Sequence, residues 1–230
     1  MIVYGRNPVR EVLRGRREVH RVWAAGGAAG EPWLAAASVE AVEASELEAL
    51  CGSRDHQGVC AETDPYPYAP ATSLLRDPEA LVICLDQVQD PHNLGSVCRV
   101  AECAGAAGVV IPERRAAEVT PAVCKASAGA VEHLALARVR NLADFLAGAK
   151  EAGAWIYGAS AGPDAVSYAV PDYRGRVVLV LGAEGAGLRP RVARTCDALV
   201  ALPMRGRVAS LNVSTAAAAL VYGILQSRTA

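Results

Sequence analysis

The chain has 230 residues, of which 52% are hydrophobic and 20% are charged, and its formal net charge at pH 7 is −1. This balance excludes a polycation and fits one or two compact domains with a real core. The apolar runs are broken by charge or glycine well short of ~18 residues, so we expect no membrane span. Seven scattered cysteines without a C-x-x-C pair indicate reduced thiols in a cytoplasmic protein.

Positive charge is concentrated at the start of the chain. Residues 1–22 carry six arginines against two glutamates, and only Lys125 and Lys150 among the 23 basic residues are lysines. The planar guanidinium of arginine has several N–H donors and is suited to binding phosphate groups and stacking on bases. A GC-rich genome that encodes much Arg and Ala explains the same composition, and on composition alone it is the stronger explanation. No apolar segment follows these arginines, so we expect no targeting peptide.

Residues 1–65 are predicted to form a small alternating α/β unit. Asn7 and Pro8 favour a helix start, with Asn as the cap and Pro at the first helical position. Pro32 predicts a second helix, and the capping-box pattern S-x-x-E from Ser45 predicts a third. Strands are expected at residues 20–25, 39–42 and 56–62.

The stretch DPYPYAP, residues 64–70, contains three prolines in seven residues. Such a segment favours a stiff extended linker, and it is the clearest domain boundary in the chain. We therefore assign residues 1–65 to a first domain, residues 66–79 to a Pro-rich linker and residues 80–230 to a second domain.

The second domain alternates near-continuous apolar strands with helices. This pattern predicts an α/β fold with a parallel sheet that is covered on both faces. Strands are expected at residues 81–88, 108–112, 133–139, 154–160, 177–183 and 197–204. Helices are expected to begin near Ser96, Pro121, Leu142, Arg189 and Leu211.

Three of these strands end in glycine-rich or polar turns. The turns are DPHNLGS (90–96), LGAEGAGL (181–188) and LPMRGRVASLNVS (202–214). Ligands of parallel sheets bind at the carboxyl ends of the strands, so these turns are the candidate site. Ser210 and Asn212 together at a helix start are typical of capping, but facing Asn93 they would form a polar cluster.

Arg99 is the least expected residue in the first turn. With Ser96 as the helix cap, Arg99 falls at the third helical position, where the helix dipole disfavours a cation and a glutamate would complete a capping box. Local rules are broken in this way mostly at functional sites. Arg99 is therefore expected to serve a function, and the rest of the chain must indicate which one.

Three other interpretations of the sequence are a hydrolase, a dinucleotide-binding site and a metal site. GASAG (158–162) matches the hydrolase pattern G-x-S-x-G, but Pro163 follows where a helix should begin, and all four histidines precede Ser160. The spacing G-x-x-G-x-G in residues 182–187 differs from the dinucleotide fingerprint G-x-G-x-x-G. The cysteines and histidines lack zinc-ligand spacing, so we expect no metal site.

Taken together, the three turns resemble the motifs of the SpoU (TrmH-like) branch of the SPOUT RNA 2′-O-ribose methyltransferases. D-P-x-N-x-G-x-x-x-R matches residues 90–99, G-x-E-G-x-G matches 182–187, and L-P-M-x-G-x-x-x-S-L-N-V-S matches 202–214. The opening MIVYGRNPVREVL and the segment DHQGV more loosely resemble the L30e-like RNA-binding domain of the bacterial 23S rRNA guanosine-2′-O-methyltransferases.

The resemblance implies a SPOUT domain with a C-terminal trefoil knot behind a small L30e-like domain. It implies S-adenosylmethionine as cofactor, bound in the knot loops at Gly182, Leu202 and Leu211. It also implies a homodimer whose active site lies at the subunit interface.

The resemblance further implies a catalytic set of Arg99, Asn93, Glu184, Ser210 and Asn212. The family's usual proposal makes this arginine the base. Because arginine stays protonated in proteins, we favour orientation and charge stabilisation by Arg99 and leave proton abstraction as the alternative. Asn93, Ser210 and Asn212 would position the ribose and Arg99, and Glu184 would order the loops or pair with Arg99.

The expected function is ribose 2′-O-methylation of RNA, with 23S rRNA at a guanosine as the substrate. One alternative is a tRNA ribose methyltransferase with the same chemistry. The other is an RNA-binding protein of ribosome assembly that has lost catalysis. No membrane or metal partner is expected.

Overall fold

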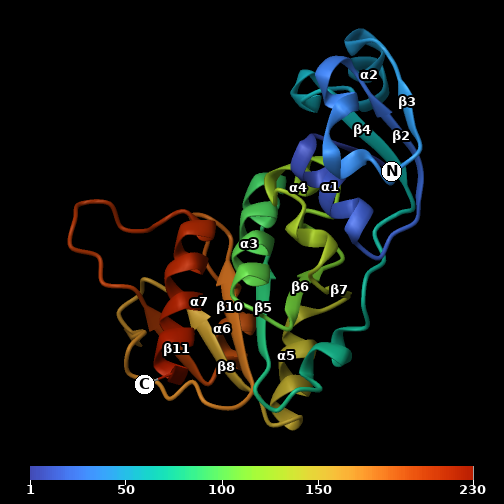
Figure 1. Ribbon diagram of the computed structural model, residues 1–230. Helices are drawn as coiled ribbons and strands as arrows, with labels where there is room; N and C mark the ends of the chain where they lie inside the picture. Colours follow the sequence, from blue (N-terminus) through green and yellow to red (C-terminus); the bar gives the residue numbers. More distant parts are fainter. Residues whose placement is uncertain (230) are drawn as a thin grey trace.

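Two β-sheets organise the chain (Figure 1). The computed structural model describes residues 1–229. The first sheet has four strands in the order β1-β4-β2-β3, and we call its residues 1–63 the front unit. The elements of the front unit are β1 (Ile2–Tyr4), α1 (Arg6–Arg14), β2 (Val19–Ala24), η1 (Gly26–Gly30), η2 (Pro32–Leu34), β3 (Val39–Ala41), α2 (Ala44–Cys51), η3 (Arg54–His56) and β4 (Val59–Thr63).

Three helix starts in the front unit differ from the predictions. α1 begins at Arg6, because Gly5 at φ 95° turns the chain directly from β1 into the helix, and Pro8 is tolerated inside the first turn. Pro32 starts only a short 3₁₀ turn, since the chain must leave after the buried Leu34 to enter β3. α2 begins at Ala44 behind Glu43, so the predicted capping box at Ser45 is wrong.

The second sheet has seven strands in the order β7-β6-β5-β10-β8-β11-β9, and every neighbouring pair is parallel. This confirms the predicted parallel α/β sheet. We call residues 71–229 the rear unit. Its elements are η4 (Ala71–Leu75), β5 (Leu81–Asp86), α3 (Pro91–Cys103), β6 (Gly108–Pro112), α4 (Pro121–Ala126), η5 (Ala130–Glu132), β7 (Leu136–Val139), α5 (Leu142–Glu151), β8 (Trp155–Ala159), β9 (Val166–Ser167), β10 (Val177–Gly182), α6 (Pro190–Thr195), β11 (Ala198–Ala201) and α7 (Val213–Thr229).

Helices cover both faces of this sheet, which explains why its strands are apolar throughout. In β5, Ile83 and Leu85 pack into the core shared with α3 and α7, whereas Val82 and Cys84 pack into the core shared with α5 and α6. Successive side chains point to opposite faces of a strand. A strand buried on both faces therefore has no polar position to alternate with.

α3 begins at Pro91, so the predicted cap at Ser96 is wrong. Asp90 caps the helix, and its carboxylate accepts a hydrogen bond of 3.0 Å from the backbone N–H of His92. Asp-Pro is the stronger start signal because proline's missing N–H costs nothing in the first turn. Arg99 consequently lies two turns inside α3, away from the positive end of the helix dipole.

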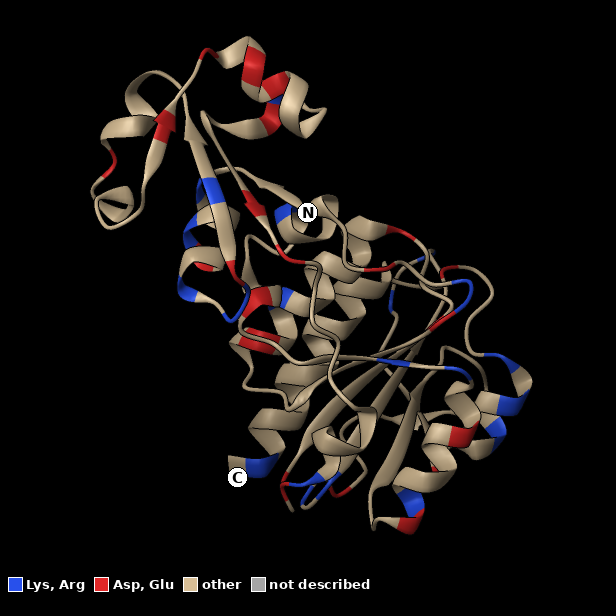
Figure 2. Cartoon of the chain, turned by 90° about the vertical axis from the view of Figure 1, so that its right-hand side faces the viewer, with Lys and Arg blue, Asp and Glu red and all other residues tan. Residues whose placement is uncertain are grey.

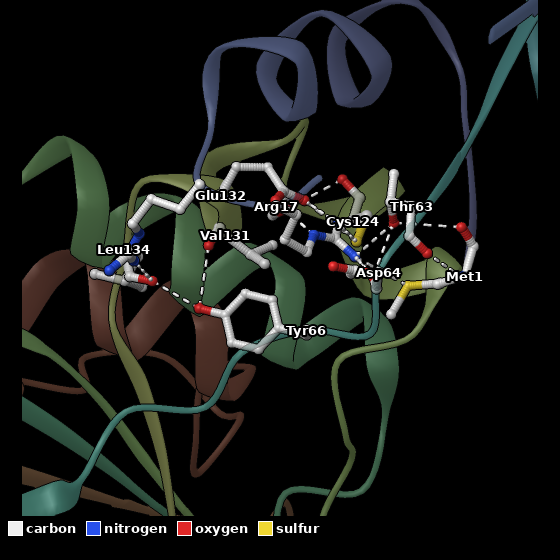
Figure 3. Close-up of polar contacts among 11 residues, drawn as sticks. Met1, Arg17, Thr63, Asp64, Tyr66, Cys124, Val131, Glu132 and Leu134 are labelled. Carbon is white, nitrogen blue, oxygen red and sulfur yellow. Dashed lines mark hydrogen bonds and ion pairs between the residues drawn. The ribbon is translucent and has the colours of Figure 1, made fainter. Parts of the chain in front are cut away.

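The front unit is fixed to the rear unit by a buried ion pair between Arg17 and Glu132 (Figure 3). Arg17 Nε donates to Glu132 Oε2 at 2.9 Å, and Arg17 Nη1 donates to Thr63 Oγ1 at 3.1 Å. Both charged side chains are only 1% exposed. Burial alone would lower the pKa of Arg17, but its bonds to Glu132 raise it, so the guanidinium keeps its charge.

The Pro-rich segment between the two units packs against the rear unit, and the predicted linker of residues 66–79 also contains the 3₁₀ helix η4. Tyr66 is buried, and its hydroxyl donates to the carbonyl oxygens of Leu134 at 2.7 Å and Val131 at 3.2 Å. Tyr68 accepts a hydrogen bond of 2.9 Å from the N–H of Val119. These contacts hold the two units in one arrangement.

The six arginines of residues 1–22 are not all available to a ligand. Arg17 is buried with Glu132, and Arg6 pairs with Glu31 at 2.9 Å. In Figure 2 the basic positions recur along α1, while acidic positions gather at α2. Within residues 1–229, no helix combines the length and the apolar character that crossing a bilayer requires.

We expect Arg17→Met to lower the free energy of unfolding by about 3–5 kcal/mol, because the substitution leaves Glu132 buried without its partner. The double variant Arg17→Met/Glu132→Leu should recover much of that loss, since it removes both charges. Urea denaturation of the full chain measures both values. A double variant no more stable than Arg17→Met would contradict this account of the interface.

Candidate active site

The carboxyl ends of β8, β10 and β11 surround a cavity of about 280 Å³. Its walls come from the turn after β8, the 181–188 turn and the loop that leads into α7. Gly182, Leu202, Leu211, Glu184 and Ser210, all predicted site residues, lie in these walls. The other lining residues are Ala159, Ser160, Ala161, Leu181, Ala183, Gly185, Ala186, Gly187, Leu188, Val200, Met204, Ala209, Val213, Ala216 and Leu220.

The 181–188 turn folds back on itself so tightly that Gly182 accepts no side chain. A Cβ placed on Gly182 would lie 2.2 Å from the carbonyl carbon of Gly187. Ala183 and Gly187 form an antiparallel bridge, while Gly185 and Gly187 have φ values of 75° and 65°. Glycine is the residue that adopts such angles without strain. The turn therefore presents backbone, rather than side chains, to the cavity.

A polar cluster of Asn93, Glu184 and Asn212 joins the three predicted turns. Glu184 Oε1 accepts hydrogen bonds from Asn93 Nδ2 at 3.1 Å and from Asn212 Nδ2 at 2.6 Å. Asn212 Nδ2 also lies 2.9 Å from Asn93 Oδ1. Asn212 Oδ1 accepts from the backbone N–H of Ser214 at 2.9 Å and so caps α7. One asparagine thus anchors both the helix and the cluster.

Asp86 and Arg189 belong to the same framework, although the sequence analysis did not select them. Asp86 is fully buried at the end of β5 and accepts from Arg189 Nε at 2.7 Å and from Arg189 N at 2.9 Å. The pair holds the end of the 181–188 turn against β5. An acidic residue that ends the otherwise apolar run LVICLD was the available signal, because buried carboxylates are nearly always paired.

Arg99 does not lie in this cavity. Its side chain is exposed on α3 and lines a second cavity, of about 230 Å³, between α1 and α3. Within residues 1–229 it has no hydrogen bond or ion pair, and Glu184 contacts Asn93 and Asn212 in its place. Glu184 thus connects two other motifs through hydrogen bonds, and its role in the reaction stays a prediction. Ser210 lines the first cavity but makes no bond to the polar cluster.

The alternative chemistries find no support in the described residues. GASAG is followed by a turn and the short strand β9 in place of the helix of a nucleophile elbow. Ser160 Oγ accepts from the N–H of Gly162 at 3.1 Å. No group of three or more His, Cys, Asp or Glu side chains in residues 1–229 could hold a metal ion. On α3, Cys98 is buried and Cys103 is exposed, so the two thiols do not face the same side.

The first cavity suits a ligand with an apolar body and a positive charge. Glu184 is the only ionisable side chain in its walls, and most of the remainder is alanine, leucine, valine and glycine. A polar ligand group would have to form hydrogen bonds with backbone atoms of the cavity walls, since few side chains there are donors or acceptors. Such a site recognises a ligand by shape and backbone contact.

Comparisons with known proteins agree with this geometry. Residues 80–222 match the SpoU rRNA Methylase family, and residues 2–69 match the family described as RNA 2′-O ribose methyltransferase substrate binding. A relative from Bacillus subtilis (strain 168), YacO, is named as a TrmH family tRNA/rRNA methyltransferase. It is 38% identical over 98% of this chain and 95% of its own.

Two solved structures cover almost the whole chain. The SpoU methyltransferase AviRb from Streptomyces viridochromogenes, solved with AdoMet, is 25% identical, with a TM-score of 0.85 over 100% of this chain and 91% of its own. An AdoMet-bound rRNA methyltransferase from Sinorhizobium meliloti is 25% identical, with a TM-score of 0.83 over 98% and 86%. The chain therefore belongs to the SpoU rRNA methylase family and is an RNA methyltransferase.

Proposed function

We propose that this protein transfers a methyl group from S-adenosylmethionine to the ribose 2′-oxygen of a guanosine in 23S rRNA. The observation that supports this most strongly is the cavity lined by two of the motif-bearing turns, residues 181–188 and 202–211, with Glu184 bonded to Asn93 of the third motif. The substrate class follows from the family. The choice of 23S rRNA rests on the resemblance of residues 1–65 to the RNA-binding domain of the bacterial 23S rRNA guanosine-2′-O-methyltransferases.

The first cavity fits S-adenosylmethionine. The ligand carries a sulfonium cation and a flat adenine ring, and the cavity offers the carboxylate of Glu184 and apolar walls. Gly182 lets the turn close, because any Cβ there would collide with the Gly187 backbone, and Leu202 and Leu211 supply apolar surface beside the turn. When bound, S-adenosylmethionine supplies an electrophilic methyl group. The chain's own part is to hold that ligand through backbone atoms of residues 182–187 and to exclude water.

We propose that Arg99 meets the RNA, while the polar cluster positions the reacting parts. A ribose hydroxyl becomes a good nucleophile only as it loses its proton, and a nearby guanidinium stabilises the developing negative charge. Asn93 lies on the same helix as Arg99 and bonds Glu184 and Asn212, so α3 links the arginine to the cofactor loops. Arg99 has donors to spare for a phosphate or a ribose oxygen.

A homodimer completes this proposal. Arg99 lines a different cavity from the cofactor residues of its own chain, so a second copy is a natural source of the missing partner. The loop of residues 202–212 projects from the body of the molecule (Figure 1) and exposes Val208 and Leu211, and Tyr222 is exposed on α7. These apolar surfaces suit a second subunit. The trefoil knot at these loops stays a prediction of the resemblance.

Ribosomal RNA is favoured over transfer RNA by the front unit. The Sinorhizobium meliloti structure, which is named as an rRNA methyltransferase, matches 98% of this chain with the front unit included. Because RNA is the substrate and all seven cysteines are free thiols, we expect the protein to act in the cytoplasm. A tRNA methyltransferase and a non-catalytic RNA-binding protein are the outcomes that the following experiments separate.

Gly182→Ala should weaken S-adenosylmethionine binding by at least about tenfold, because its Cβ would collide with the backbone of Gly187 and open the turn. Gly148→Ala is the matched control, since a Cβ on this glycine of α5 meets no atom within 4 Å. Isothermal titration calorimetry with S-adenosylmethionine measures both. Equal affinity in the two variants would place the cofactor elsewhere, and no binding by the parent chain would favour the non-catalytic RNA-binding protein.

Arg99→Ala should reduce methyl transfer by about 10²–10³-fold, the usual loss when one charge-stabilising donor is removed. S-adenosylmethionine affinity should stay within several-fold, because Arg99 lies outside the first cavity. Tritium transfer to 23S rRNA and to tRNA, followed by mapping of alkali-resistant linkages, measures the activity and its substrate. Full activity in Arg99→Ala would remove this residue from the mechanism, and methylation of tRNA alone would replace the proposed substrate.

A further inference from the structure

A second cavity, of about 230 Å³, lies between the front and rear units. We call it the interdomain hollow. It shares no residue with the first cavity. Its walls are Asn7, Arg10 and Glu11 of α1, Arg99, Glu102 and Cys103 of α3, and Ser127, Ala128, Ala130 and His133 of the chain between α4 and β7.

The walls of the interdomain hollow are held in a fixed arrangement. Glu11 Oε2 lies 2.9 Å from His133 Nε2, so one hydrogen bond crosses directly between the units. Gly129, at φ 88°, brings the turn before η5 so close to α1 that a Cβ would lie 2.6 Å from Glu11 Cβ. The buried pair of Arg17 and Glu132 lies behind this turn. A site whose walls are already in place loses less entropy when it binds a ligand.

Two walls of the interdomain hollow each present an arginine that a ligand can bind. Burial alone would raise the pKa of Glu11, but bonds from His133 and Arg10 and the charge of Arg14 lower it, so its anion is already satisfied. Arg10 uses only Nε for Glu11, at 3.0 Å, and its Nη1 and Nη2 make no bond within residues 1–229. Arg99, on the opposite wall, has no partner in the same range.

The interdomain hollow also offers an acceptor and a limited volume. Glu102, one turn beyond Arg99, makes no side-chain bond within residues 1–229, and a carboxylate accepts hydrogen bonds from hydroxyl groups. RNA differs from DNA by its 2′-hydroxyl, which donates such a bond. The volume lies below the ~300–1,000 Å³ of pockets that enclose whole drug-sized ligands. A sugar–phosphate unit that stays attached to a longer chain fits this size and this mixture of groups.

We infer that the interdomain hollow binds one sugar–phosphate unit of the RNA substrate next to the nucleotide that is methylated. Arg10 and Arg99 hold the phosphate from the two units, and Glu102 accepts a ribose hydroxyl. The front unit thereby contributes a residue, Arg10, to the placement of RNA at the catalytic helix α3. This inference rests on the proposed function, and it assigns Arg10 as a positioning residue.

The test compares Arg10→Ala with Arg14→Ala. Both arginines lie on α1 and form an ion pair with Glu11, so each variant removes one positive charge and one ion pair to Glu11. Only Arg10 lines the interdomain hollow. With 23S rRNA transcripts, Arg10→Ala should weaken binding about tenfold and reduce the slope of log affinity against log salt by about 0.7–0.9, the value for one phosphate contact. Arg14→Ala should change affinity less than twofold and keep the slope.

Cys103 provides a direct probe, since it is the exposed cysteine on the wall of the interdomain hollow. N-ethylmaleimide labelling of the full chain, mapped by mass spectrometry, should modify Cys103 in the free protein and spare it when 23S rRNA transcript is present. S-adenosylmethionine alone and inorganic phosphate alone should not protect it. Equal losses in the two arginine variants, or a Cys103 whose labelling RNA does not change, would overturn the inference.

These outcomes are separable from failure of the proposed function. If the parent chain methylates rRNA while Arg10→Ala behaves as Arg14→Ala does, the interdomain hollow is not a binding subsite but the proposed function stands. If no RNA is methylated, the proposed function fails, and protection of Cys103 by RNA still decides whether the interdomain hollow binds it. A Cys103 that is unreactive without RNA would mean that another copy of the chain covers the interdomain hollow, and it would also overturn the inference.

Discussion

The buried ion pair between Arg17 and Glu132 fixes the position of one unit on the other. Removing two charges from water is costly, and the pair is tolerated because nearly every donor of Arg17 finds an acceptor on Glu132, Thr63 or Asp64. The bonds to Glu132 reach the rear unit, while Thr63 and Asp64 hold the guanidinium from the side of the front unit. The pair therefore selects a position more than it adds stability, and the interdomain hollow takes its shape from that position.

In the active site, too, carboxylates connect separate elements of the fold through their hydrogen bonds. Asp86 has no exposed surface and is satisfied by Arg189, and Glu184 is satisfied by two asparagines from turns that are distant in the sequence. Each carboxylate joins the ends of elements that the parallel sheet has already brought together. Backbone groups of the glycine turn are thereby left to face the cavity. A cofactor that binds backbone needs walls fixed in this way, because flexible loops would have to be ordered on binding.

Much of the rear unit could be predicted, because apolar periodicity and strand-end turns follow directly from a sheet covered on both faces. The meeting of residues 182–187 with 202–214 at one cavity was predicted for the same reason. The start of α3 differs from the prediction because Asp90 followed by Pro91 is a stronger start signal than Ser96. The place of Arg99 and the role of Arg17 could not be predicted, since both depend on how two units pack, and no local pattern encodes that packing.

The rear unit depends on the front unit for the partner of its buried Glu132. Residues 1–63 supply the partner of Glu132 and one wall of the interdomain hollow, so removing them would leave a buried carboxylate unpaired in the catalytic unit. A loss of RNA binding after such a deletion would combine two causes. Substitutions on the exposed face of α1 avoid this confusion, because Arg10 and Arg14 are partly exposed and Glu132 keeps its partner. The proposed RNA-binding surface spans both units, and the buried pair of Arg17 and Glu132 fixes the interface between them.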